Sequence, residues 1–352
     1  MAFIKKFHLS KTSRVNFATY GMVILAFVVM QLLGSRGMLS STIRGQLVPI
    51  CAYVVMALSL NLTVGVLGEL SLGHAGFMSV GAFAGAVAAA ALPIPSGPLR
   101  LGAAMLIGAV LAGLVGVVVG VPVLRLNGDY LAIVTLAFGQ IIKSIVENLY
   151  IGMDSTGLRF SFLENHIVFA DGGRMVLNGP MGVNGINKIS TFTAGFVLIM
   201  IVLIVIFNLV NSRAGRAIMA LRDNRIAAES VGINVTKYKL MAFVTSAAMA
   251  GAAGTLFALG QNTITASKFD FNMSILILVF VVLGGQGNMW GSILAAAFLT
   301  VLPETPAMRG LADYRMLIYA VILILVMLAT NNPAIQDFIN SKFRKKKKGA
   351  AK

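Results

Sequence analysis

Charged residues are scarce in this sequence. They make up 11% of its 352 residues, whereas hydrophobic residues make up 58%. A soluble globular domain carries about 25% charged residues, so this chain has too few polar side chains to cover a water-exposed surface. The composition therefore excludes an ordinary soluble domain and predicts an all-α polytopic membrane protein, in which 37 glycines would permit close helix packing.

Cysteine and histidine are also rare. The single cysteine, Cys51, lies in an apolar run, so one chain can form neither a disulfide framework nor a cysteine-based metal site. The three histidines, His8, His74 and His166, are too widely scattered to suggest a zinc cluster. We therefore expect no metal site, no cofactor and no catalytic residues.

Motifs for nucleotide chemistry and hydrolysis are missing. The chain has no GxxxxGK[ST] phosphate-binding loop, and it has no HExxH or GxSxG motif. Carboxylates are almost absent from the apolar runs, although proton- or sodium-coupled carriers usually need them. These absences argue against a membrane-bound enzyme and against a self-contained secondary transporter, which remain the alternatives to a subunit driven by separate ATPases.

The basic residues that are present are concentrated. Seventeen of the 28 lysines and arginines lie in residues 1–17, 212–239 and 342–352, together with two of the 12 acidic residues. Membrane proteins keep such segments on the cytoplasmic side, so the net charge of +16 does not indicate nucleic-acid binding. We interpret the tail at residues 342–348 as an anchor to anionic membrane lipids.

Ten apolar runs approach the length of about 20 residues that a membrane span needs. With a cytoplasmic N-terminus, ten spans place all three basic segments, and hence both termini, in the cytoplasm. Eight spans also satisfy the charges if the short eighth and ninth runs form a re-entrant hairpin and another pair is miscounted. The runs are residues 18–34, 46–66, 76–92, 101–121, 129–146, 193–211, 239–260, 272–285, 288–303 and 312–330.

These runs predict two helical halves joined by a long external loop. The loop is too long for a bare connector, and it is either a surface loop or part of a docking face for an external partner. The predicted regions are a basic cytoplasmic N-terminus (1–17), a first helical half (18–146), the external loop (147–192), a second helical half (193–330) that includes a cytoplasmic loop (212–239), and a basic cytoplasmic tail (331–352).

Two glycine-rich turns, within residues 65–86 and 281–298, interrupt the apolar runs. Non-helical backbone is tolerated in a bilayer only where protein or a water-filled cavity surrounds it, and broken helices often line transport sites. We interpret Gly81 and Gly85 as a helix-packing pair.

Three polar groups in the first of these turns, and one on the fifth predicted span that could pair locally with Lys143 or face a cavity, are candidates for a substrate pathway, because polar and ionisable residues are uncommon near a membrane core and usually have a purpose there. The candidates, chosen on polarity alone, are Glu69, Ser71, His74 and Gln140.

The cytoplasmic loop predicts a short capped helix. Asp223 or Asn224 can cap its start, and Gly232 can end it in a left-handed conformation. A helix of two turns is not stable alone in water, so it rests either on the membrane surface or in a groove of a partner protein. The small apolar stripe that favours the partner consists of Ala217, Leu221, Ala228 and Val231.

Residues 220–240, ALRDNRIAAESVGINVTKYKL, resemble the cytoplasmic coupling loop of the M-type permeases of branched-chain amino acid ABC transporters. Residues 61–86, 124–142 and 284–298 are similar to further segments of that family. Residues 179–186, GPMGVNGI, resemble its glycine-rich external turn, with departures at Met181 and Val183. The resemblance extends over about residues 40–330.

This resemblance implies an ABC importer in the bacterial inner membrane. Two different permease chains would form the pathway, two ATP-binding subunits would drive it, and an external solute-binding protein would deliver leucine, isoleucine or valine. Urea, short amides and other amino acids remain alternative cargoes. The residues that the resemblance assigns to the coupling helix are Arg222, Asp223, Asn224, Ala227, Ala228, Glu229, Gly232 and Asn234.

Overall fold

The computed structural model describes residues 11–37, 40–126, 128–154, 157–162 and 173–302, together with the isolated residues Tyr314, Leu317, Ile318, Ala320, Val321 and Ile324. The chain divides into one compact unit over residues 1–297 and a second over residues 298–352. The first unit contains all the described strands, nearly all the described helices and both glycine-rich turns.

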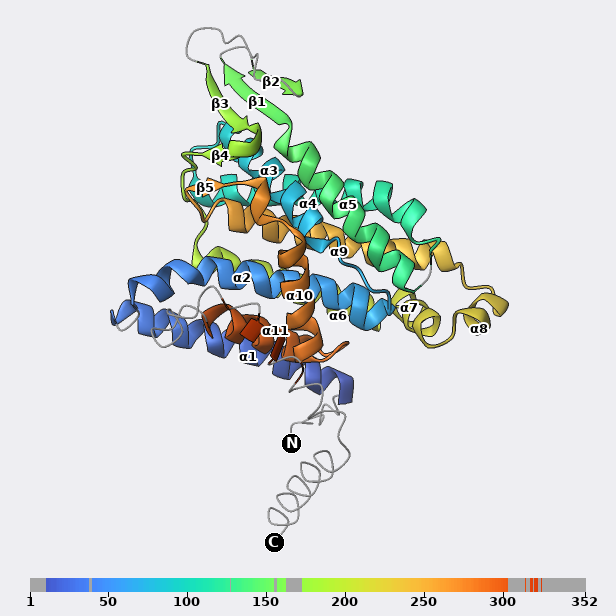
Figure 1. The fold of residues 1–352 in the computed structure, drawn as a ribbon. Helices are drawn as coiled ribbons and strands as arrows, with labels where there is room; N and C mark the ends of the chain where they lie inside the picture. Colours follow the sequence, from blue (N-terminus) through green and yellow to red (C-terminus); the bar gives the residue numbers. More distant parts are fainter. Residues whose placement is uncertain are drawn as a thin grey trace, which may run out of the picture. The chain divides into compact units, whose positions relative to one another are not determined.

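Eight helical segments in the described ranges are long and apolar enough to span a membrane, in agreement with the first eight predicted runs (Figure 1). They are α1 (Lys11–Ser35), α2 (Ser41–Asn61) with the π-helix η1 (Leu62–Leu67), α3 (His74–Ala91), α4 (Gly97–Val123), α5 (Asp129–Glu147), α6 (Phe192–Asn211), α9 (Val235–Ala258), and α10 (Phe271–Gly284) with the 3-10 turn η3 (Ala266–Lys268).

The mainly helical membrane fold is therefore confirmed, whereas the number of spans stays a prediction. The ninth predicted run forms α11 (Met289–Val301), a helix of 13 residues that is short for a span. The tenth run, 312–330, lies outside the described residues apart from isolated positions. The basic tail and residues 1–10 also lie outside them.

Glycines bring α3, α4 and α9 into close contact at the centre of the first unit (Figure 1). A Cβ atom added to Gly81 would lie 2.0 Å from the carbonyl oxygen of Gly251, and one added to Gly85 would lie 2.3 Å from Cγ2 of Thr255. The hydroxyl of Thr255 donates to the carbonyl of Gly81 at 2.8 Å. The interpretation of Gly81 and Gly85 as a packing pair is confirmed, since only residues without a side chain allow this approach.

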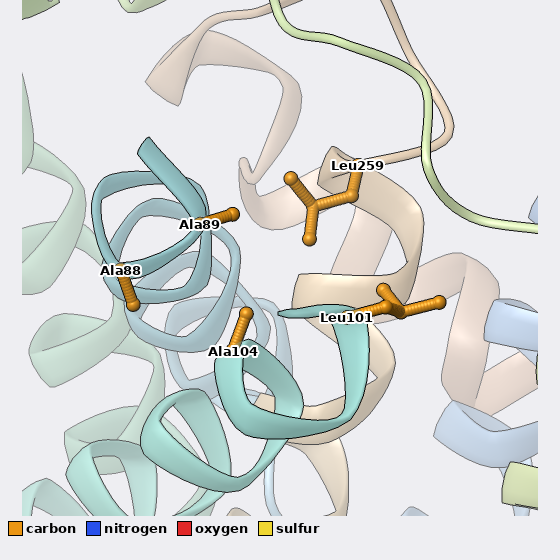
Figure 2. Close-up of a cluster of buried hydrophobic side chains, with 5 residues drawn as sticks. All are labelled: Ala88, Ala89, Leu101, Ala104 and Leu259. Atoms are coloured by element: carbon orange, nitrogen blue, oxygen red, sulfur yellow. The ribbon is translucent and has the colours of Figure 1, made fainter. Parts of the chain in front are cut away.

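An apolar cluster closes the far end of the same three helices (Figure 2). Ala88 and Ala89 come from the last turns of α3, Leu101 and Ala104 from the start of α4, and Leu259 follows α9. All five are buried. The partly buried Ile186 and Ile189 pack against the cluster, so the end of the long loop is fixed to the helices by apolar contacts.

The long loop contains strands that the sequence did not predict. Three of them, β1 (Leu149–Asp154), β2 (Gly157–Phe162) and β3 (Arg174–Asn178), form an antiparallel sheet in the order β2-β1-β3, with a bulge between Ile151 and Gly152. After the 3-10 turn η2 (Gly179–Met181), β4 (Val183–Asn184) pairs with β5 (Thr263–Ile264), which follows α9. The described part of the loop thus begins with an ordered sheet, and its glycine-rich end turns at Gly179, Gly182 and Gly185, which have positive φ.

Candidate functional site

The short helix predicted in the 212–239 loop is α8 (Arg225–Ser230), and it follows α7 (Arg213–Asp223) directly. Of the two predicted caps, Asn224 is the one used: its side-chain oxygen accepts from the backbone N–H of Ala227 at 3.0 Å. Gly232 ends the helix with a φ of 84°, a left-handed conformation that glycine adopts without a steric penalty. The side chain of Asn234 then caps α9 by accepting from the N–H of Lys237 at 3.0 Å.

The prediction that Ala217, Leu221, Ala228 and Val231 form a single apolar stripe is wrong at Val231. The helix is interrupted at Asn224, so these four residues do not share one helix. Leu221 and Ala228 are buried with Val235 in a small cluster. Val231 instead lies at the C-terminus of α8 with 75% of its surface exposed.

Most of the surface of α8 faces away from the protein. Ala228 is its one buried residue, whereas Ala227 and Glu229 are exposed. Ile226 is 81% exposed and, with Val231, gives this short helix two large uncovered apolar side chains. An exposed helix of this kind, fixed by caps at both ends, is suited to insertion into a groove of another protein.

Arg222, in the last turn of α7, contacts a distant part of the chain. Its guanidinium donates to the backbone carbonyl of Gly65 in η1, 157 residues earlier in the chain. The aliphatic part of the Arg222 side chain packs over Gly68, where an added Cβ atom would lie 2.8 Å from Cγ of Arg222. The end of α7 is therefore attached to the segment in which α2 loses its regular helical form. Arg222 and the neighbouring Asp223 are both exposed.

Asn61 holds this segment to the second glycine-rich turn. Its side-chain oxygen accepts from the N–H of Gly287 at 2.8 Å, and its amide nitrogen donates to the carbonyl of Asn288 at 3.1 Å and to the hydroxyl of Ser292 at 2.8 Å. All three partners lie at the junction of α10 and α11. One fully buried side chain at the end of α2 thus satisfies polar groups of the other interrupted helix.

Glu69 forms an ion pair with Lys239 of α9. The two side chains are 14% and 4% exposed, respectively. Lys239 lies near the N-terminus of α9, where a helix dipole disfavours positive charge, and Glu69 compensates that charge. The non-helical stretch between η1 and α3 is therefore tied to α9 by opposite charges.

His74 begins α3 and is fully buried. Its Nε2 lies 2.8 Å from the hydroxyl of Ser246, and that hydroxyl donates its only proton to the carbonyl of Ser59 at 2.5 Å. Since Ser246 can then only accept from the ring, Nε2 carries the imidazole proton and Nδ1 is a bare acceptor. Neither Nδ1 nor the buried hydroxyl of Ser71 has a hydrogen-bond partner in the described ranges. Two unsatisfied polar groups therefore lie beside the non-helical stretch between η1 and α3, which we call the break.

Gln140 is half-buried on α5. This helix crosses the break, because the hydroxyl of Thr135 accepts from the N–H of Leu72 at 3.1 Å and a Cβ added to Gly76 would lie 3.0 Å from the Cα of Gly139. The structure thus brings Glu69, Ser71 and His74 into one segment, with Gln140 on the helix that crosses it. No hydrogen bond within the described residues joins Gln140 to the other three.

Residues 42–327 match the family described as the permease component of the branched-chain amino acid transport system. The chain belongs to this permease family. The permease is 36% identical over 288 residues to the high-affinity branched-chain amino acid transport system permease protein LivM of Salmonella typhimurium (strain LT2), covering 78% of this chain and 66% of LivM. LivM of Escherichia coli (strain K12) is 36% identical over 286 residues, with the same coverage.

The ribose import permease protein RbsC of Escherichia coli (strain K12) is more distant, with 26% identity over 285 residues that cover 79% of this permease and 81% of RbsC. No solved structure is significantly similar to the chain. The permease spans 66% of the length of its LivM relatives.

Sequence reasoning missed the partners that hold the site together. Asn61 stands in an apolar run, and this isolated buried amide was a signal that could have identified it. Lys239 was counted among the loop bases, although it is buried against Glu69. Ser246 gave no signal, since single serines are common in small-residue helices.

Proposed function

We propose that this permease is the membrane-spanning subunit of an ABC importer for branched-chain amino acids in the bacterial inner membrane. The supporting observation is the exposed, doubly capped α8, whose neighbour Arg222 contacts the interrupted helix segment. The 36% identity to LivM supports leucine, isoleucine and valine as cargo over ribose, because the ribose permease is 26% identical.

The orientation follows from charge. Residues 212–239 carry six basic residues, and such loops stay in the cytoplasm. Both termini and α8 are then cytoplasmic, and the β-sheet of the long loop is external. This orientation presents α8 to ATP-binding subunits and the sheet to a solute-binding protein.

Energy would reach the pathway through α8. The chain belongs to a permease family and carries no phosphate-binding loop, so partner subunits would bind and hydrolyse ATP. Their closure would move α8, and Arg222 would pass that movement to η1 and to the turn that Asn61 holds. Alternating access requires an element with two arrangements, and the interrupted segments with their polar contacts suit that role better than the closely packed helices.

The pathway would run beside this break and between this chain and a second, different permease subunit. His74 Nδ1 and the Ser71 hydroxyl have unused hydrogen-bonding capacity there, which the ammonium or carboxylate of a passing amino acid could satisfy. Glu69 is neutralised by Lys239, so we assign it to holding the segment in place, and Gln140 remains a pathway candidate. Lipid contacts the outer helices, and nothing in this arrangement calls for nucleic acid.

Reconstitution tests the proposal. The complete complex, with its second permease, ATP-binding subunits and solute-binding protein, should accumulate labelled leucine in liposomes only when ATP reaches the ATP-binding subunits. Uptake driven by an ion gradient without ATP, or uphill transport by this chain alone, would refute it. Competition by isoleucine and valine but not by ribose or urea would assign the cargo.

A further inference from the structure

A small cavity lies at the end of the helices opposite to α8. Helix α3 starts at the break near Arg222 and runs 18 residues, roughly 27 Å at 1.5 Å per residue, to its last turn at this cavity. The cavity has a volume of about 120 Å³. It is lined by Ala86, Ala89, Ala90, Arg100, Arg174, Met175, Val176, Val183, Asn184, Gly185, Ile186, Asn187, Ile189 and Leu259.

Its base and its polar groups come from different elements. Ala89 and Leu259 belong to the buried apolar cluster of Figure 2 and close the cavity on the helix side. Arg100 projects from the start of α4 and Arg174 from the first residue of β3. Asn184 at the end of β4 and Asn187 after it complete the polar lining. The long loop and the helices thus build the cavity together.

The lining is positively charged, and none of the described residues that form it carries a carboxylate. The Nε atom of Arg100 is buried without a hydrogen-bond partner in the described part of the chain. A buried polar group on a cation is costly unless something pairs with it. Arg100 also lies in the first turns of α4, where the helix dipole adds positive potential. These features favour an anionic group with hydrogen-bond acceptors, and a carboxylate fits the forked donors of arginine.

The size and charge of the cavity favour a protein side chain over free cargo. Small-molecule pockets usually measure about 300–1,000 Å³, more than twice the 120 Å³ found here. A free amino acid would also bring an ammonium group, for which the described lining, with two arginines and no acidic residue, provides no counter-charge. An aspartate or glutamate side chain brings the carboxylate alone.

We propose that Arg100 and Arg174 form a receptor pocket for an acidic side chain of the solute-binding protein. This inference rests on the proposed function, since it needs the long loop to be external. The apolar base would hold the stem of the acidic side chain, and the guanidinium groups would bind its carboxylate. The pocket would fix the docked protein over the outer end of α3 and α4.

The test compares three variants in the complete complex: Arg100→Gln, Arg174→Gln and Lys188→Gln. Lys188 is exposed on the same loop, next to Asn187, but does not line the cavity, so it controls for long-range charge. The measured quantity is the concentration of leucine-loaded solute-binding protein that half-stimulates ATP hydrolysis. Each arginine variant should raise this half-stimulating concentration on the order of tenfold or more. Lys188→Gln should raise it by less than about twofold.

A cross-linking experiment covers the case in which a glutamine variant fails to assemble. Arg174→Lys retains the charge and introduces a primary amine, which a carbodiimide joins to a neighbouring carboxylate as an amide, with the water taken up as urea. The proposal expects one cross-link from position 174 to an aspartate or glutamate of the solute-binding protein. Cross-linking at position 188 but not at 174 would overturn it.

The outcomes separate this inference from the proposed function. If the wild-type complex imports leucine with ATP and both arginine variants respond to the solute-binding protein as the wild type does, the receptor pocket is refuted and the import function stands. If docking is unchanged but leucine uptake falls, the pocket binds cargo and the proposal is also refuted. If the wild-type complex shows no ATP-driven uptake, the proposed function itself fails.

Discussion

Helix α3 begins in a network of polar contacts and ends in apolar packing. At its start, His74, Asn61 and the Glu69–Lys239 pair connect non-helical backbone to several helices through hydrogen bonds and charge. At its end, alanines and leucines pack without any polar contact among them (Figure 2). Polar contacts can be exchanged for others at small net cost, whereas close-packed interiors resist deformation. We infer that α3 pivots at its start and is held fixed at its end.

The largest expected effect comes from Gly81, in the packed part of α3. A leucine there would drive its side chain into the backbone of Gly251, since an added Cβ already lies 2.0 Å from that carbonyl oxygen. We expect Gly81→Leu to destabilise the protein by about 3 kcal/mol or more, the upper end for overpacking. Gly102→Leu is the matched control, because nothing lies within 4 Å of a Cβ at Gly102. Thermal unfolding in detergent measures both, and equal melting temperatures would contradict rigid packing of α3.

The second prediction concerns the ion pair at the break. Glu69→Gln leaves the charge of Lys239 buried without its counter-ion and should lower the free energy of unfolding by roughly 2–4 kcal/mol. This loss is somewhat smaller than for a fully buried pair, because Glu69 is 14% exposed. The double variant Glu69→Gln/Lys239→Met removes both charges and should recover most of that stability. A double-mutant cycle on unfolding free energies gives the coupling, and additive losses would show that the pair does not hold the break.

The sequence predicts features that depend on neighbouring residues, but it does not predict contacts between residues that are far apart in the chain. The eight described spans and the caps of α8 follow from local signals, namely apolar length and the positions of Asn224 and Gly232. The predicted apolar stripe through Val231 was wrong because one capping residue, Asn224, ends α7 and starts α8, so the helical periodicity does not continue across it. Contacts such as Arg222 with Gly65 join residues 157 positions apart, and no local pattern encodes them.

The unpredicted sheet has a related cause. Its central strand, β1, is buried at Ile151, Gly152 and Asp154, which is not the alternation that marks a half-exposed strand. The buried carboxylate of Asp154 is compensated by Arg159, whose Nε lies 2.7 Å away across the β1–β2 hairpin. The burial pattern of β1 can be explained only when its pairing with β2 and β3 is known.

The third prediction tests whether movement enters at the polar end of α3. Arg222→Gln removes the charged contact with the Gly65 carbonyl and should lower leucine uptake per ATP hydrolysed roughly tenfold, the effect of losing about 1.4 kcal/mol of coupling. Arg216→Gln is the control, since Arg216 lies on the same helix and its side chain donates to the nearby carbonyl of Asn211. Uptake and ATP hydrolysis measured on the same liposomes give the ratio. An unchanged ratio in Arg222→Gln would remove the link between α7 and the break.

The smallest expected effect on the stability of the permease lies on the exposed face of α8. Ile226 is 81% exposed, so Ile226→Ser should leave the melting temperature within experimental error. If the side chain enters a groove of an ATP-binding subunit, its loss should weaken assembly by about 1–3 kcal/mol, the value of one buried aliphatic side chain. Leu99→Ser, at a position that is 69% exposed near the opposite end of the helices, should leave assembly with the ATP-binding subunits unchanged. Titration of these subunits onto the reconstituted permease measures the difference, and equal affinities for the two variants would place the contact with the ATPase elsewhere than α8.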